Sequence, residues 1–231
     1  MDGAALNAAR EKAECTQVQL ARKLGVTQAY LSLMESGKRR VPPRLARMLT
    51  RLLHLPPTML PVTTPSTSRK RLTNDWLAAQ LARLGYPGFA YQRRPGPMQS
   101  PVEVLLEGLA LDPLEARLVE ALPWMLLRYE GFDVQRLVTD AKARDLQNRL
   151  GFVVTLARNV AERNGRFEPR VPELRLLEAA LQPSRLAREE TFGEGHPSEQ
   201  MREWLREART DAARHWNLLT DLKVEHLPYA N

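Results

Sequence analysis

The sequence predicts an all-α fold. Apolar residues recur at helical spacing through most of the 231 residues, and several of these segments open with capping residues. The one short β-branched run, residues 152–154, has no second strand-like segment to pair with, so a buried helix is the better interpretation. With 43% hydrophobic residues the chain is long enough for two domains with cores of their own.

Two short helices are predicted in the stretch TQVQLARKLGVTQAYLSLMESGKRR, residues 16–40. Thr16, with Gln19 three residues later, forms a capping pattern for the first helix, and Thr27 caps the second. Gly25 between them suits the left-handed residue that ends a helix and lets the chain double back. The residues assigned to the core are Leu20, Ala21, Leu24, Val26, Leu31 and Met34. The stretch therefore predicts a helix-turn-helix.

The same stretch resembles the XRE class of DNA-binding domains, which is typified by phage repressors and Cro. The resemblance covers about residues 4–60 and implies a lambda-repressor-like helix-turn-helix domain. The residues that carry it are Gln17, Leu20-Ala21, Leu24-Gly25-Val26, Ser32, Glu35 and Gly37-Lys38-Arg39.

The resemblance implies a role for each exposed polar residue of this stretch. Gln28 would read base edges, since a Gln can pair in a bidentate way with adenine, and Gln17 would hold both Gln28 and a phosphate. Glu35 would pair internally or orient neighbouring bases, and Tyr30 either stacks on the DNA or packs half-buried. The expected DNA-binding residues are Gln17, Thr27, Gln28, Ala29, Tyr30, Ser32, Lys38, Arg39 and Arg40.

Positive charge is concentrated in the N-terminal third of the chain. Residues 1–71 hold 13 Lys and Arg against 4 Asp and Glu, a net charge of +9, whereas the remainder holds 21 against 23, a net charge of −2. Such a concentration is typical of a surface that meets phosphates, although a solvated basic face gives the same count. For Lys38, Arg39 and Arg40 we expect phosphate contacts, with an ordinary helix end and solvated charges as the alternative.

Several functional classes are disfavoured by what the sequence lacks. A single cysteine, Cys15, rules out an internal disulfide and a multi-cysteine metal cage, and the four histidines have no metal-site spacing, so we expect no metal and no cofactor. There is no Gly-rich phosphate loop and no nucleophile elbow, so we expect no enzyme. Without an apolar run long enough to cross a membrane, a cytoplasmic protein that does not enter membranes is expected.

Three carboxylates are candidates for a hydrolytic site. Asp133, Asp140 and Asp145 lie in one helical region, but i,i+4 pairs with neighbouring bases are the better interpretation. The bases concerned are Lys142, Arg144 and Arg149. Buried Gln147 or Asn148 is expected to bond backbone rather than ligand.

Composition predicts the domain boundaries. We expect a helix-turn-helix domain over residues 1–60, closed by a helix after Pro42-Pro43. A linker rich in Pro, Ser and Thr follows over 61–75, and an all-helical dimerisation or partner-binding domain over 76–231. In that domain Gly85 should end one helix, residues 87–101 should form an irregular loop, and Asp112 should cap a helix that Pro123 kinks or divides.

The last predicted helix, residues 198–226, carries apolar residues at alternating steps of four and three. Such a seam indicates a partner helix, and a long helix lying across its own domain gives nearly the same pattern. The predicted partner or dimer interface comprises Met201, Trp204, Leu205, Ala208, Ala212, Trp216, Leu219 and Leu222.

The resemblance implies a sequence-specific repressor that binds double-stranded DNA as a homodimer at a palindromic operator. The helical block over residues 112–157 is also similar to the C-terminal part of helix-turn-helix antitoxins encoded beside nucleotidyltransferase-type toxins, which implies a cognate toxin as partner. Two alternatives remain: an autonomous ligand-sensing repressor without a protein partner, and a scaffold or inhibitor whose DNA-binding domain is secondary.

Overall fold

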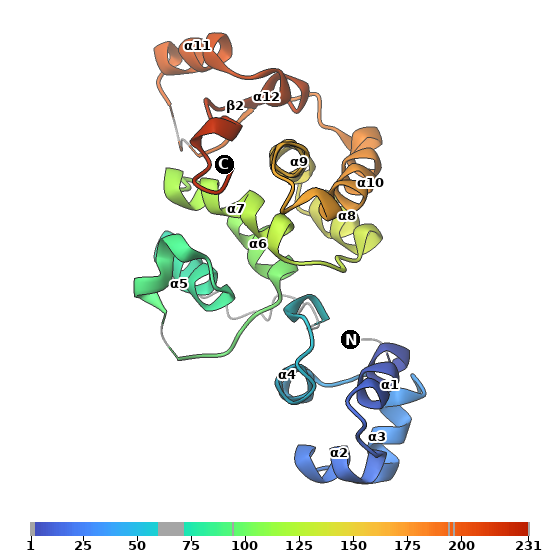
Figure 1. Ribbon diagram of the computed structural model, residues 1–231. Coiled ribbons are helices and arrows are strands. Elements are labelled where there is room, and N and C mark those ends of the chain that lie inside the picture. The colour runs from blue at the N-terminus through green and yellow to red at the C-terminus, as the bar shows by residue number, and fades with distance from the viewer. Residues whose placement is uncertain (1–2, 60–71, 94, 194, 196, 231) are drawn as a thin grey trace. The chain divides into compact units, whose positions relative to one another are not determined.

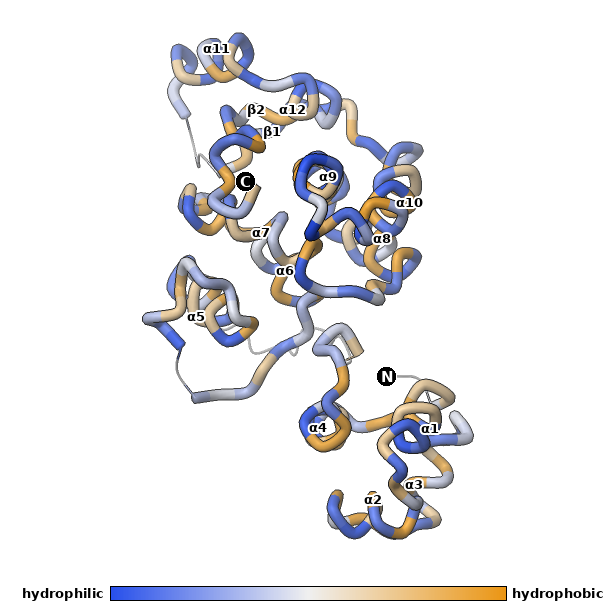
Figure 2. The backbone as a smooth tube through the Cα atoms, viewed as in Figure 1, coloured by the Kyte–Doolittle hydropathy of each residue, from blue (hydrophilic) through white to orange (hydrophobic). Residues whose placement is uncertain are grey.

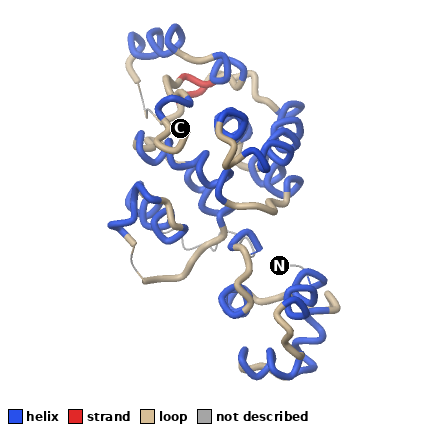
Figure 3. The backbone as a smooth tube through the Cα atoms, viewed as in Figure 1, coloured by secondary structure: helices blue, strands red, loops and turns tan. Residues whose placement is uncertain are grey.

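The computed structural model describes residues 3–59, 72–93, 95–193, 195 and 197–230 (Figure 1). It confirms the all-α prediction, because in the described residues strand is confined to two segments of two residues each (Figure 3). The chain divides into two compact units, one of Met1–Thr67 with Met98–Ser100 and one of Ser68–Pro97 with Pro101–Asn231. Residues 61–71 of the predicted linker lie outside the described residues.

In its described residues, the N-terminal unit contains four α-helices. They are α1 (Gly3–Lys12), α2 (Gln17–Leu24), α3 (Gln28–Glu35) and α4 (Pro43–Leu52), followed by the short 3-10 helix η1 (Pro57–Met59). Their buried core comprises Leu6, Leu20, Ala21, Leu24, Leu31, Met34, Val41, Ala46 and Leu49. All predicted core residues of α2 and α3 are buried, and Val26 in the turn is partly buried against them. Val18 and Leu33, which are not among the predicted core residues, are exposed.

The caps of α2 and α3 are those that the sequence predicts. The Thr16 hydroxyl accepts from the Gln19 backbone N–H and the Gln19 side chain accepts from the Thr16 N–H, which completes a capping box. Gly25 has φ 67°, a left-handed conformation that glycine adopts without strain. The Thr27 hydroxyl accepts from the Tyr30 N–H and fixes the start of α3.

The C-terminal unit is built around α9 (Gln147–Arg163), which Figure 1 shows end-on between α7 and α10. The other elements, in chain order, are α5 (Asn74–Leu84), η2 (Pro87–Gln92), α6 (Pro101–Ala110), α7 (Ala116–Arg128), α8 (Val134–Lys142), η3 (Glu168–Arg170), α10 (Val171–Leu181), η4 (Gln182–Ser184), β1 (Glu190–Thr191), α11 (Glu199–Ala208), α12 (Asp211–His215), β2 (Leu218–Leu219) and η5 (Val224–His226). Residues 152–154 lie buried within α9, so the prediction of a buried helix is confirmed.

The prediction of one long helix over residues 198–226 is wrong. Arg209 ends α11, Thr210 caps a new short helix, and the chain then enters β2, which pairs in parallel with β1. Four of the eight predicted interface residues are buried in the core of their own unit: Leu205, Trp216, Leu219 and Leu222. Ala208 and Ala212 are half-buried, and Met201 and Trp204 are exposed.

Other local predictions for this unit also need correction. Asp112 does not cap a helix: α7 begins at Ala116, and Asp112 lies 3.4 Å from the guanidinium of Arg149 instead. Pro123 lies inside α7 and does not divide it. The loop before α6 is partly ordered as η2, whereas Gly85 ends α5 in a left-handed conformation as predicted.

The predicted charge pairs around α8 are replaced by others. Asp133 caps α8, Asp140 pairs with Arg136, and Asp145 pairs with Arg188. Arg144 pairs with Glu107 and Arg149 with Asp112 and Glu190, because these bases point across the unit rather than along their own helix. The buried Asn148 exchanges two hydrogen bonds with the backbone of Leu186, as expected of a structural amide.

Candidate nucleic-acid interface

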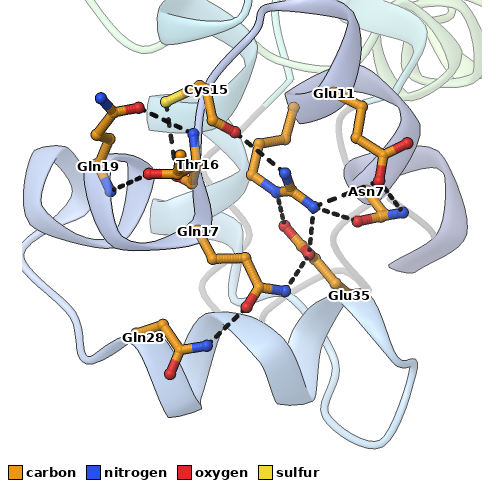
Figure 4. Close-up of polar contacts among 9 residues, drawn as sticks. Asn7, Glu11, Cys15, Thr16, Gln17, Gln19, Gln28 and Glu35 are labelled. Carbon is orange, nitrogen blue, oxygen red and sulfur yellow. Dashed lines mark hydrogen bonds and ion pairs between the residues drawn. The ribbon is translucent and has the colours of Figure 1, made fainter.

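A chain of hydrogen bonds links the two glutamines that open α2 and α3. The Nε2 of Gln28 donates to the Oε1 of Gln17 over 2.7 Å, and the Nε2 of Gln17 donates to Glu35 over 2.8 Å (Figure 4). Two nitrogens of Arg10 donate to the same carboxylate over 2.7 and 3.1 Å. These hydrogen bonds link α1, the end of α3, the start of α2 and Gln28, the first residue of α3.

Arg10 and Glu35 form the buried end of this chain. Their side chains are 11% and 5% exposed, and the Glu35 carboxylate raises the pKa of Arg10 above its ordinary value. Arg10 also donates to the Cys15 carbonyl over 3.0 Å and to the Asn7 side chain, so most of its donors are occupied within the domain. Glu35 therefore pairs internally, one of the two roles that the resemblance implies.

The direction of the chain is fixed by its carboxylate. An ionised carboxylate only accepts hydrogen bonds, so Gln17 must turn its NH₂ group toward Glu35 and its oxygen toward Gln28. Gln28 must then turn its NH₂ group toward Gln17. One N–H and the oxygen of Gln28 remain for a partner beyond the protein, and this is the donor and acceptor pair that adenine N7 and N6 require.

The remaining predicted residues of α3 lie around Gln28. Thr27, Gln28 and Ala29 are exposed at the N-terminus of α3, and Ser32 is half-buried one turn later. Tyr30 packs half-buried against the core of the domain, and the guanidinium of Arg39 lies 4.5 Å from its ring centre. The structure thus brings Tyr30 and Arg39 together.

The turn after α3 presents the three predicted basic residues. Gly37 has φ 71°, and the Arg39 N–H donates to the Leu33 carbonyl over 2.9 Å, which ties the turn to the last turn of α3. Lys38, Arg39 and Arg40 are all exposed. The exposed amide of Gln28 and these three exposed cations thus lie on one helix and on the turn that follows it.

Cations are used differently in the two units. In the described part of the N-terminal unit, Arg10 is the one base that forms an ion pair with a side chain. Nine other Lys and Arg side chains there make none: Lys12, Arg22, Lys23, Lys38, Arg39, Arg40, Arg44, Arg47 and Arg51. In the C-terminal unit, by contrast, arginines such as Arg158, Arg170 and Arg209 pair with glutamates. Unpaired cations concentrated on one domain are expected of a surface that binds phosphates.

Sequence reasoning missed Arg10, which contacts no predicted recognition residue directly but anchors the acceptor that orients Gln17. A signal for it exists in the sequence, because an acidic residue in a basic domain needs a partner when it is buried. The distance of 25 positions between Arg10 and Glu35 hides that partner from local patterns.

Comparison with known proteins supports the class of the N-terminal unit. Residues 3–61 match the family model of a helix-turn-helix domain. Searches of curated proteins and of solved structures found no match to the chain. Among the described residues, no helix is long and apolar enough to cross a membrane.

The helix-turn-helix domain, with its exposed Gln28 and its unpaired cations, indicates a DNA-binding transcription regulator.

Proposed function

We propose that the protein is a sequence-specific transcriptional repressor of the XRE type. The observation that carries this proposal is the orientation of Gln28 by Gln17 and Glu35, since it holds a bidentate amide at the exposed start of α3 before any DNA is bound. Lys38, Arg39 and Arg40 would contact phosphates beside it and fix its register. Such a protein would act in the cytoplasm, with the DNA that it binds.

The proposed binding species is a homodimer on a palindromic operator. One helix-turn-helix reads only a few base pairs, so two-fold symmetry doubles the recognised sequence and places the two recognition helices about 34 Å apart, one turn of DNA. The C-terminal unit, residues 76–231 in the proposed domain division, would supply the dimer contact or receive the signal.

A cognate toxin is the proposed signal, which would make the protein an autoregulatory antitoxin. The observation that favours a protein partner is the exposed pair on α11, where Met201 is 42% and Trp204 is 50% exposed although both are large and apolar. The proposed partner interface therefore centres on two of the eight residues predicted from sequence, Met201 and Trp204. An autonomous ligand-sensing repressor remains the second candidate.

The DNA-binding proposal is tested by selecting a binding site from random duplexes with the purified full chain. Gln28→Ala should weaken binding to the selected site by about 1–3 kcal/mol and leave binding to a random duplex nearly unchanged. Gln200→Ala, at an exposed glutamine of α11, is the matched control and should alter neither. Equal losses on both duplexes in Gln28→Ala would remove the base-reading role.

The partner proposal is tested by recovering tagged protein from its native host. A neighbouring gene product should co-purify in stoichiometric amount with the wild type and be lost with Trp204→Ala. If only the chain and DNA are recovered, the toxin proposal fails and the ligand-sensing repressor is favoured.

A further inference from the structure

The exposed face of α4 carries three arginines. They lie outside the predicted DNA-binding residues on α3 and in the turn at residues 38–40. Arg44, Arg47 and Arg51 follow one another at steps of three and four, so they form one line along the helix. All three are exposed, whereas Ala46, Leu49 and Thr50 on the opposite face are buried. Figure 2 shows α4 nearly end-on, with hydrophilic residues on one side and hydrophobic residues on the other. We call these three residues the α4 ridge.

Nothing on α4 neutralises this ridge. From Ser36 to Asn74 the sequence contains no Asp or Glu and nine Lys or Arg. Within the described part of the chain, no carboxylate lies in ion-pair distance of Arg44, Arg47 or Arg51. Like charges one turn apart on a helix repel one another, so the arrangement weakens the isolated helix.

On helices of the C-terminal unit, some arginines are neutralised by carboxylates of the same helix. Arg158 pairs with Glu162 one turn later, and Arg136 pairs with Asp140 in the same way. An arginine that serves only as a solvated surface residue gains from such a carboxylate. The absence of such a carboxylate throughout α4 indicates that the compensating negative charge comes from another molecule.

The position of Arg44 strengthens this argument. It lies in the first turn of α4, directly after Pro43, where the helix dipole disfavours a positive side chain. Arg51, in the last turn, is favoured by the same dipole, so helix stability explains Arg51 alone. An external anion would favour all three.

We propose that the α4 ridge is a second phosphate-binding surface, which contacts the DNA backbone in addition to the turn at residues 38–40. Arg44 and Arg51 are seven residues apart, about 10 Å along the helix axis. Phosphates of one DNA strand are spaced about 3.4 Å along the duplex axis, so a ridge lying parallel to that axis would span about three of them. A planar guanidinium can form two hydrogen bonds with one phosphate, which suits arginine to this contact better than lysine.

The inference rests on the proposed DNA-binding function, but it makes a separate claim about the number of phosphates that the domain contacts. Phosphates are the same in every sequence, so the ridge adds affinity and salt dependence without adding specificity.

The experiment measures binding of the full chain to a random-sequence duplex of about three helical turns, by fluorescence anisotropy over a series of salt concentrations. Arg44→Gln, Arg47→Gln and Arg51→Gln should each reduce the slope of log K against log salt by about 0.9. Lys142→Gln, at an exposed cation of α8 in the C-terminal unit, is the charge-matched control and should leave the slope unchanged. Circular dichroism verifies that each variant is folded.

Three other outcomes would overturn the proposal, and they separate it from the DNA-binding function. Unchanged slopes in the ridge variants, with a reduced slope in Lys38→Gln, remove the ridge but leave the function intact. Equal reductions in the ridge variants and in Lys142→Gln show a general charge effect rather than a contact surface. Absence of binding to any duplex removes both the ridge and the proposed function.

Discussion

The amide of Gln28 donates to the side-chain oxygen of Gln17 over 2.7 Å, and the two glutamines lie on different helices. Because Gln17 is itself held by Glu35, Gln28 is restrained in rotamer and in amide orientation in the absence of DNA. A side chain that is already ordered loses less conformational entropy on binding. This relationship makes the contribution of Gln28 depend on Gln17.

The dependence predicts energetic coupling between the two glutamines. In a double-mutant cycle of Gln17→Leu and Gln28→Leu, the coupling energy on a selected operator should be about 0.5–1.5 kcal/mol. On a random duplex the coupling energy should be near zero, because Gln28 then has no matching base to hydrogen-bond. Binding titrations of the four proteins on both duplexes measure it, and additive effects on the operator would show that Gln17 acts independently, for example through a phosphate.

The buried pair of Arg10 and Glu35 predicts a large and asymmetric effect on stability. Glu35→Leu alone leaves the Arg10 charge buried without its carboxylate and should lower the free energy of unfolding of the N-terminal unit by about 3–5 kcal/mol. The double variant Arg10→Met, Glu35→Leu removes both charges and should be more stable than Glu35→Leu.

The stability of both variants must be measured with a probe that reports on the N-terminal unit alone. All four tryptophans lie between residues 76 and 216, so their fluorescence reports on the C-terminal unit, and hydrogen exchange of the α2 and α3 amides is the suitable measurement. A double variant no more stable than Glu35→Leu would contradict the desolvation argument. The double variant should still lose operator specificity, since Gln17 no longer has an acceptor.

Local signals explain which parts of the molecule the sequence predicts. Thr16, Gly25 and Thr27 act within four residues of their own positions, so the caps and the turn of the helix-turn-helix could be read directly. The bracing of Gln28 by Gln17 was also expected, but only through the resemblance to a known class. The anchor at Arg10 was missed, because it depends on packing between helices that are distant in the sequence.

In residues 198–226, by contrast, the local pattern led to a wrong prediction of one long helix. A spacing of three and four residues establishes periodicity but not continuity, and the helix ends at Arg209 in spite of it. Thr210 was a readable sign of a new start, since its hydroxyl accepts from the Ala213 N–H. The side chains expected to meet a partner instead fill the core, and the largest of them is Trp216.

The packing of Trp216 predicts a sharp difference between two glycines. A Cβ added at Gly151 would lie 2.5 Å from three ring carbons of Trp216, whereas one added at Gly165 would have no atom within 4 Å. Gly151→Ala should therefore destabilise the C-terminal unit by about 1–3 kcal/mol through overpacking, and Gly165→Ala should be nearly neutral. Urea unfolding followed by tryptophan fluorescence compares them, and equal stabilities would show that the indole shifts without cost.

The buried Glu190 predicts a pH dependence of stability in the same unit. Its Oε2 lies 3.4 Å from the Nε of Arg149, and its Oε1 is buried without a hydrogen-bond partner. Burial raises the pKa of Glu190 above its ordinary value, and the nearby charges of Arg149 and Arg188 offset this only in part. The folded protein thus holds this proton more tightly than the unfolded chain.

The sign of the effect follows from linkage. A carboxyl whose pKa is raised by folding contributes stability that is fully present below its unfolded pKa and is lost as the pH rises through its folded pKa. The difference in unfolding free energy between the wild type and Glu190→Gln should therefore fall as the pH is raised across this window. Glu225→Gln is the control with the opposite sign, because a hydrogen bond from Arg163 lowers the pKa of Glu225. Urea unfolding of the three proteins at a series of pH values tests both signs, and a pH-independent difference for Glu190→Gln would show that burial leaves its proton affinity unchanged.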